Sequence, residues 1–443
     1  MGRTPNTALA ALMAEADWGN GQLARAVNRA GSEAGLALHY GASTVTYWLR
    51  GALPKEAARP VIVEALSRRI RRPITCADVG FPGHATEEAA DLADLVRGDM
   101  DPSRRGVLSA GLYSAALMVP HFSDVGDRLD TSDDGVKAGR TVRIGQGEVS
   151  TVQKMTDHIA AILDDLGGGH ARPMAAAFLA NTVLSWLDAD ATPKVHDDML
   201  GAAADFVYLT GWMAMYERAH GLGQRYFVQA LDLAKDAQDH VTYCRTLRGM
   251  ALQASNLGYG PKALEYADSA AEAAPAAGPR LTAFLRGQQA HGAAMVKDRR
   301  QAFSRLRETE AALAKADGRN DAVGGYDQAA YQFHVSHVLY ELGDLPGSIK
   351  AMQQSNGVRP VNERQGRVHA NGVLASRQWE FGHIEAACAT WERFLDDYTS
   401  LSTARGDEHF ATLRKSVQAQ PNSRVVRQLG ERVRVVAGQK AAT

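Results

Sequence analysis

Residues 39–54 read His-Tyr-Gly-Ala-Ser-Thr-Val-Thr-Tyr-Trp-Leu-Arg-Gly-Ala-Leu-Pro and carry the signals of one complete short helix. Ser43 is a hydroxyl residue of the kind that caps a helix at its start. Gly51 is placed to end the helix, and Pro54 follows just beyond it. The segment therefore predicts a helix of about two turns with well-defined ends.

The two faces of this predicted helix differ in chemistry. Val45, Trp48 and Leu49 recur at helical spacing and form an apolar stripe. The opposite face carries hydrogen-bonding groups of a size suited to base edges and phosphates, as a helix in a DNA major groove requires. The residues of that polar face are Ser43, Thr44, Thr46, Tyr47 and Arg50.

Helical periodicity also surrounds this segment, at about Thr7–Ala16, Asn20–Asn28 and Glu56–Ile70. The set resembles the Cro/phage-repressor (XRE-type) helix-turn-helix family, through Gln22-Leu23-Ala24 at the opening of the first motif helix and through Ser43–Gly51. The resemblance covers residues 1–80 and implies a DNA-binding domain with Gln22 at a phosphate or base. Arg29–Gly41 is longer than the usual turn, which predicts either an insertion or a short extra helix.

The predicted head is basic and the rest of the chain is acidic. Residues 1–80 hold 10 Lys and Arg against 6 Asp and Glu, whereas the remainder holds 39 against 44. Such an asymmetry is typical of a nucleic-acid-binding module, and Arg25, Arg29 and Lys55 are candidate phosphate contacts. The cluster Arg68–Arg72 fits either a phosphate contact or the favourable end of a helix dipole.

Helical repeats are predicted after residue 147. Small or apolar residues recur seven positions before, and five, nine and twelve after, each of Gly258, Lys297, Gly343 and Gly382. A degenerate unit is expected over Trp212–Ala237. The pattern resembles tetratricopeptide repeats. The recurring residues are Ala251, Ala263, Ala267 and Ala270 around Gly258; Ala290, Ala302, Leu306 and Thr309 around Lys297; Ser336, Ser348, Met352 and Ser355 around Gly343; and Ala375, Ala387, Trp391 and Phe394 around Gly382.

Stacked helical hairpins form a superhelix with a concave face that commonly holds a peptide, a partner helix or a small molecule. Polar and aromatic residues, mostly on the first helix of each hairpin, are the candidates for ligand contact there. They are Tyr208, Trp212, Tyr216, Arg245, Arg248, Asn256, Arg286, Gln289, Tyr331, His334, Asn371 and Arg377.

The remaining segments divide the chain further. Residues 81–147 are predicted to hold an acidic linker with a short helix, a buried helix at Val107–Val119 and a loop from residue 131. The repeats span 148–413. Residues 414–443 predict a basic helix whose stripe of Val425, Val426, Leu429 and Val433 follows a cap at Ser423. This helix fits a solenoid cap, and a dimer or auxiliary phosphate contact is the alternative.

No catalytic motif is found: the sequence lacks a P-loop, a His-Glu-x-x-His motif and a Gly-x-Ser-x-Gly elbow. Gly167-Gly168-Gly169 is interpreted as a helix stop, and His334-x-x-His337 lacks an evident third metal ligand. Cys76, Cys244 and Cys388 are far apart, which predicts no disulfide or zinc site. We therefore expect no enzyme, cofactor or metal, and, with no apolar span or secretory signal, a cytoplasmic location.

The sequence thus predicts an all-α protein, with an N-terminal helix-turn-helix domain followed by a tetratricopeptide-like α-solenoid. This layout resembles actinobacterial, Streptomyces-type transcriptional regulators. The resemblance implies a cytoplasmic homodimer that binds an inverted-repeat operator in double-stranded DNA. It also implies that the protein controls secondary metabolism or development. The solenoid would sense a peptide or small-molecule effector or mediate dimerisation. The alternative is a tetratricopeptide adaptor whose N-terminal domain binds protein.

Overall fold

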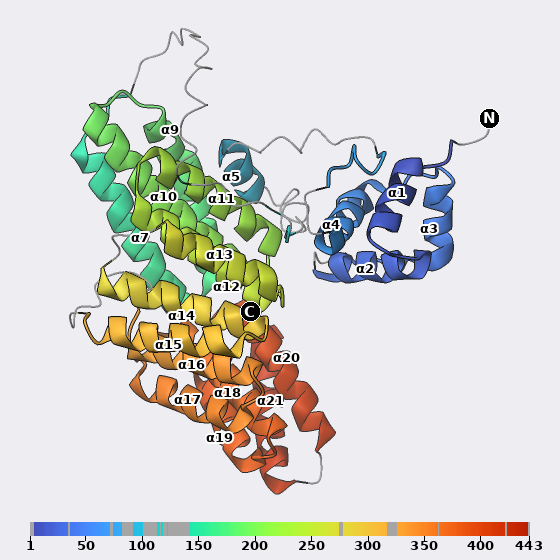
Figure 1. The fold of residues 1–443 in the computed structure, drawn as a ribbon. Coiled ribbons are helices and arrows are strands. Elements are labelled where there is room, and N and C mark those ends of the chain that lie inside the picture. Colours follow the sequence, from blue (N-terminus) through green and yellow to red (C-terminus); the bar gives the residue numbers. More distant parts are fainter. Residues whose placement is uncertain are drawn as a thin grey trace. The chain divides into compact units, whose positions relative to one another are not determined.

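The chain forms two compact units of helices (Figure 1). The first comprises Met1–Asp134 with Ala219–Gln229, and the second Gly135–Arg218 with Ala230–Thr443. Apart from an isolated bridge between Arg143 and Asp190, the regular structure of the described residues is helical, which confirms the all-α prediction. The computed structural model describes residues 4–33, 36–70, 74–81, 92–100, 113–115, 117, 122, 142–273, 278–316, 326–361, 363–420 and 423–441.

The first unit contains a small helical domain with its own core. Fully buried apolar residues from each of its first four helices meet in that core, among them Leu9, Leu23, Val45 and Ile62. Asn6 closes the domain, because its side chain caps α1 through Leu9 N and donates to Val79 O. The helices are α1 (Thr7–Glu15), α2 (Asn20–Glu33), α3 (Ala42–Leu49), α4 (Arg59–Ile70, after a 3-10 turn at Glu56–Ala58) and α5 (Leu92–Met100).

Two details of the predicted motif were wrong. Helix α2 runs on to Glu33, five residues past Asn28, so the connection is shorter than predicted, and its described part, residues 36–41, is not helical. Gly31 does not break the helix; a Cβ there would lie 2.5 Å from Leu38 Cδ1, so the glycine makes room for the returning chain. The N-cap of α3 is Gly41 rather than Ser43.

Asn28 holds the connection against α2. Its side-chain amide donates to Tyr40 O at 2.9 Å and accepts from Tyr40 N at 2.8 Å. The Tyr40 ring then packs edge-on against Trp48, with centroids 5.0 Å apart. Helix α3 ends as predicted at Gly51, whose φ of +88° suits glycine. The start of the recognition-like helix is therefore fixed from α2 despite the long connection.

The second unit is a series of antiparallel helical hairpins, followed by a last helix that packs its Val426, Leu429 and Val433 against the preceding pair. The first half of α11 belongs to the first unit. The helices are α7 (Gln146–Leu166), α8 (Gly168–Phe178), α9 (Leu184–Leu187), α10 (Pro193–Tyr216), α11 (His220–Asp236), α12 (His240–Asn256), α13 (Gly260–Glu272), α14 (Pro279–Met295), α15 (Arg299–Leu313), α16 (Gln328–Glu341), α17 (Leu345–Val358), α18 (Arg364–Glu380), α19 (Ile384–Tyr398), α20 (Ala404–Ala419) and α21 (Arg424–Ala441).

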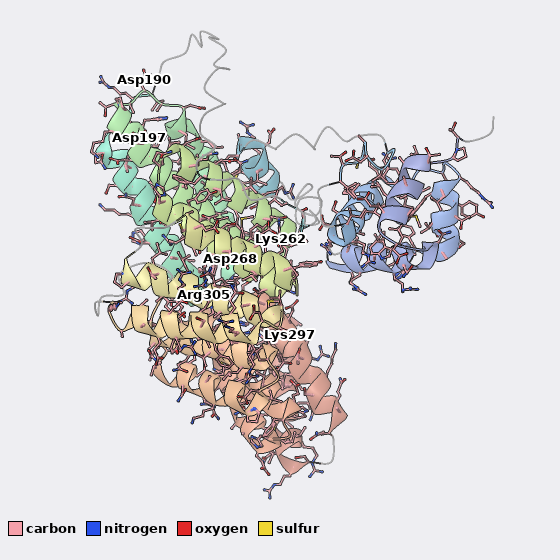
Figure 2. All side chains as sticks on the ribbon, in the orientation of Figure 1. Asp190, Asp197, Lys262, Asp268, Lys297 and Arg305 are labelled. Atoms are coloured by element: carbon pink, nitrogen blue, oxygen red, sulfur yellow. The ribbon has the colours of Figure 1, made fainter. Side chains whose placement is uncertain are left out.

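The predicted repeat register is confirmed at the turns. Gly258, Gly343 and Gly382 have φ values of +80°, +85° and +89°, and Lys297 occupies the same position with φ of +65°. Lys297 lies in the turn between α14 and α15 and is labelled in Figure 2. All sixteen recurring small or apolar positions are buried, none more than 6% exposed. Small side chains therefore lie where paired helices cross, as the offsets predicted.

The superhelix of the second unit closes on itself. Gly169 N donates to Ser402 O at 3.1 Å, Ser402 N donates to Leu166 O at 2.8 Å, and Ala404 N donates to Glu217 Oε2 at 3.4 Å. We call these contacts the closing seam. Gly167, with φ of +90°, allows this approach, because a Cβ there would lie 2.1 Å from Ser402 O. The glycine run predicted as a helix stop is also what lets the seam close.

Several predicted segments lie largely outside the described residues. Of Val107–Val119, only 113–115 and 117 are described, and these are not helical. The loop predicted from residue 131 is described only from Val142, and the short helix predicted before Arg105 is α5. Within the described residues, no helix combines the length and apolar character needed to cross a membrane.

Candidate DNA-binding face and repeat interior

Helix α3 presents a polar face on one side and anchors itself in the domain core on the other. Val45 is 0% exposed and Trp48 is 4% exposed, whereas Tyr47 is 60% exposed. Ser43 and Arg50 are also exposed, and Thr44 is half-buried. The predicted division of this helix therefore holds in space, since a rigid core fixes one face and leaves the other accessible.

Thr46 differs from its neighbours on the polar face. It is half-buried, its hydroxyl accepts from Asn20 Nδ2 at 2.9 Å, and it donates to Ala42 O at 3.1 Å. These bonds tie α3 to the first residue of α2. Thr46 is thus placed to position the helix, and Asn20 is a contributor that sequence reasoning missed.

The basic residues of the head fall into two groups. Arg25, Arg50 and Lys55 are exposed, and no described carboxylate lies within ion-pair distance of them. Gln22 is exposed as well, and its side chain accepts from Gly19 N at 2.7 Å at the start of α2. By contrast, Arg68 donates to Glu64 and to Tyr113 O.

Arg69 likewise donates inward, to Ala16 O at 2.8 Å. Arg68 and Arg69 are therefore engaged in internal contacts of the first unit, which favours the structural alternative for the described part of the basic cluster. Among the described residues of the head, the exposed cations Arg25, Arg29, Arg50 and Lys55 are available for phosphates.

The interior of the second unit contains a row of aromatic and basic side chains. On α10, the Tyr208, Trp212 and Tyr216 rings follow one another, with centroids 6.0 Å and then 5.1 Å apart. The Arg248 guanidinium of α12 lies 5.0 Å from the Trp212 centroid and 3.8 Å from the Phe284 centroid. Arg248 is only 9% exposed, and burial lowers its pKa.

Two further arginines lie in the same interior. Arg377 is 5% exposed, donates to Ser336 Oγ at 2.6 Å and stacks over the Tyr340 ring, and burial lowers its pKa to about 10. Arg405 is half-buried, donates to His369 Nε2 at 2.5 Å and lies 4.9 Å from the Tyr216 ring centroid. We refer to Arg248, Arg377 and Arg405 as the interior arginines.

Histidines surround the interior arginines and are held neutral. Burial, and then the charge of Arg377, lowers the pKa of His291 to about 4. Burial, and then Arg405, lowers that of His409 to about 3. The pKa values of His334, His337 and His369 are also well below the usual range, with burial as the main cause. These rings therefore serve as neutral hydrogen-bonding groups.

The structure does not bring all twelve predicted ligand residues together. Tyr208, Trp212, Tyr216, Arg248, His334 and Arg377 lie in the interior. Arg245 contacts this group through its guanidinium, 5.2 Å from the Tyr208 ring centroid, and the other five do not join it. Arg245 pairs with Asp205, Asn256 is exposed, Arg286 and Gln289 bond to each other and to Glu308 and Asp268, Tyr331 packs beside α15, and Asn371 accepts from Asn356.

Sequence reasoning missed Phe284, Arg405 and four of the interior histidines. A signal was present, because histidines recur on the first helices of successive hairpins, at His291, His337, His369 and His409. Of the predicted pair on α16, His334 has its Nδ1 2.8 Å from the phenolic oxygen Oη of Tyr326. The described residues hold no group of three His, Cys, Asp or Glu side chains arranged for a metal ion.

A separate acidic cavity of about 420 Å³ lies among α7, α10 and the start of α12. Two of its carboxylates are already neutralised, Asp198 by Lys194 at 2.8 Å and Asp205 by Arg245 at 2.8 Å. Burial raises the pKa of Asp205. The lining would favour a cation, and Asp197, on α10, is labelled in Figure 2. The aspartates of the lining are Asp157, Asp197, Asp198, Asp205 and Asp239.

Comparisons with known proteins give a local match to the head. Residues 9–82 match the family model described as SP15 N-terminal domain. A similar solved structure is that of a Rap protein complexed with Competence and Sporulation Factor. It shares 13% identity at a TM-score of 0.37, covering 65% of this chain and 88% of that one. No curated protein matches. The resemblance of the head to phage repressors stays a prediction.

Proposed function

We propose that this chain is a sequence-specific DNA-binding regulator whose repeat unit binds an effector. The observation that carries the proposal is the geometry of α3, with Val45 and Trp48 locked in a core and Tyr47 and Arg50 exposed. A helix held rigidly by one face can place the side chains of its other face against base edges. The unneutralised Arg25 and Lys55 would add phosphate contacts beside it.

The proposal includes a homodimer on an inverted repeat. Half-sites of such operators lie about 34 Å apart, one turn of DNA, so the spacing of two heads controls affinity. An effector in the repeat unit regulates binding only if it favours one conformation over another. Genomic footprinting would reveal the operator, and the genes beside bound sites would test the predicted link to secondary metabolism or development.

The test uses the operator found by footprinting and the full-length chain. We expect Arg50→Ala and Tyr47→Ala each to weaken operator binding about tenfold or more, because each removes a contact worth about 1–3 kcal/mol. Arg50→Ala should also reduce the salt dependence of binding if its contact is to a phosphate. Arg307→Ala is the matched control, since Arg307 is an exposed arginine of α15, outside the head and outside the basic segment from residue 414.

Operator affinities of both head variants equal to that of the control would remove the assignment of α3 as the reading helix. Footprinting that recovers no preferred site at physiological salt would favour the adaptor alternative, in which the head binds protein. In that case, partner proteins that bind the purified wild-type chain should no longer bind the Tyr47→Ala variant, because the same exposed face of α3 would contact them.

A further inference from the structure

The interior of the second unit carries three arginines that no described carboxylate contacts directly, although the charges of Glu341 and Glu380 act on Arg377 and that of Glu408 acts on Arg405. Arg248 and Arg377 are buried and Arg405 is half-buried, yet no described carboxylate forms an ion pair with any of the three. The histidines beside them stay neutral, as their low pKa values indicate. Buried charges are normally paired, because removing an ion from water without a partner is costly.

The hydrogen bonds of the interior arginines do not resolve this imbalance. The Nε of Arg248 has no hydrogen-bond partner, and aromatic rings lie against its guanidinium. Arg405 donates to the neutral His369 ring and lies over Tyr216. Arg377 donates to Ser336. Neutral acceptors and ring faces offset part of the desolvation cost, but none supplies a negative charge.

A small cavity lies directly beside Arg405. Its volume is about 10 Å³, the space of a single water molecule, and Tyr216, Gln365, His369 and Thr403 line it together with the arginine. Gln365 is 6% exposed, and its Oε1 has no hydrogen-bond partner. A half-turn of this amide would let the Thr403 hydroxyl donate to Oε1 and would aim an N–H into the cavity.

We infer that this cavity binds an anionic group, a carboxylate or a phosphate, with Arg405 and the Gln365 amide as its direct ligands and the Thr403 hydroxyl holding that amide in place. Arg248, whose charge acts on Tyr216 as that of Arg405 does, adds positive charge to the same interior. A guanidinium beside an amide N–H donor is chemistry that suits a carboxylate or a phosphate. The acidic cavity near α12 carries no comparable inference, since no unpartnered buried group points into it.

The position of the cavity suggests how a larger ligand would enter. Thr403 and Arg405 follow directly after Ser402, the residue at the closing seam. Because the cavity has a volume of only about 10 Å³, a molecule that carries the anion needs more room, and parting the seam would provide it. This regulatory reading rests on the proposed effector role of the repeat unit, whereas the binding itself does not depend on DNA.

Thermal unfolding of the full-length chain, without DNA, tests the inference. Sodium phosphate and sodium succinate are the probes, compared with sodium chloride at equal ionic strength. We expect phosphate or succinate at about ten times its Kd to raise the Tm by roughly 2 °C or more beyond chloride. Arg405→Gln should abolish this shift, and Arg414→Gln, an exposed change on the same helix, should keep it.

Equal responses of the wild type to chloride and to both probes would overturn the inference, as would an unchanged response in Arg405→Gln. If Arg405→Gln does not fold, Gln365→Leu replaces it, because loss of the amide should reduce the shift while the arginine remains. A response to one probe only would assign the anion as phosphate or carboxylate. Since no DNA is present, a failure here leaves the proposed DNA binding untouched.

Discussion

Arg68 is half-buried in the first unit and Arg248 is buried in the second, and the two differ in what surrounds their charge. Arg68 lies 2.6 Å from Glu64 in a buried ion pair and also donates to Tyr113 O at 3.0 Å. Arg248 has no such carboxylate and lies between the Trp212 and Phe284 rings. The fold can place a carboxylate beside an arginine that has a structural role, as it does for Arg68. The lack of such a carboxylate beside Arg248 therefore points to a ligand.

The Glu64–Arg68 pair belongs to a hydrogen-bond network of the first unit. Glu64 also accepts from Ala115 N at 2.9 Å, although burial raises the pKa of its carboxyl. The adjacent Ser114 exchanges two bonds with the Gln224 amide, at 2.6 Å and 2.7 Å. The pair thus holds the backbone of residues 113–115 between α4 and α11.

The largest expected effect is from removal of this structural carboxylate. Glu64→Ala should lower the free energy of unfolding of the first unit by about 3 kcal/mol, because it removes the buried carboxylate that lies 2.6 Å from the half-buried Arg68. Urea unfolding measures the change. Asp94→Ala is the control, since its partner Arg97 lies 3.5 Å away in an exposed pair and such pairs contribute little.

Equal, small losses in Glu64→Ala and Asp94→Ala would show that Arg68 does not need its partner. The contrast between the two units would then lose its meaning, because an arginine without a carboxylate would be tolerable in either of them.

An effect that is smaller for each pH unit is expected from acid, through the neutral histidines of the second unit. The pKa of His409 is about 3 in the folded chain, against an ordinary value of 6.5, because of burial and the nearby Arg405. Because the pKa of His409 is lower in the folded chain than in the unfolded chain, the stability that the neutral ring contributes is fully present above pH 6.5. This contribution to the free energy of unfolding is lost as the pH falls towards 3. The loss is about 1.4 kcal/mol per pH unit for one such group.

His409→Gln removes this titration, so its unfolding free energy should fall less steeply than that of the wild type between pH 6.5 and 4. Urea unfolding across this range gives both slopes. Parallel slopes would mean that His409 takes up its proton without cost, and the interior could then not be as positive as the uncompensated arginines imply.

Much of the repeat architecture could be predicted, because turns and helix crossings follow local rules. Glycine in the left-handed region and small residues at crossings recur in sequence, and even Lys297, which lacks the glycine, was placed correctly. The division of α3 into a buried and an exposed face was predictable for the same reason. Ser43 was wrongly assigned as the cap, since Gly41 offers no side chain and leaves no capping signal.

The interior could not be predicted, because it depends on contacts between distant residues. Arg364 donates to Asp165 O across 199 positions, and the closing seam joins helices of the first and last hairpins. No periodicity encodes such closure. The repeat pattern placed both Arg248 and Arg286 on the first helix of a hairpin and did not distinguish them. Only the closure of the superhelix makes Arg248 an interior residue, whereas Arg286 pairs with Glu308.

The smallest expected effect is from Arg248→Met, and it sharpens the comparison most. The change removes the contacts of the guanidinium with the Trp212 and Phe284 rings, and their loss should destabilise the fold by about 0.5–2 kcal/mol. It also removes the desolvation cost of a buried charge. Replacing such a charge with an apolar side chain of similar size often stabilises the fold by an amount comparable to the lost ring contacts. In buffer without phosphate or carboxylates, the unfolding free energy should therefore change by less than about 1 kcal/mol, measured in urea beside Glu64→Ala. A loss as large as that of Glu64→Ala would show that Arg248 is already satisfied in the free protein, and the interior would then have no need of an anion.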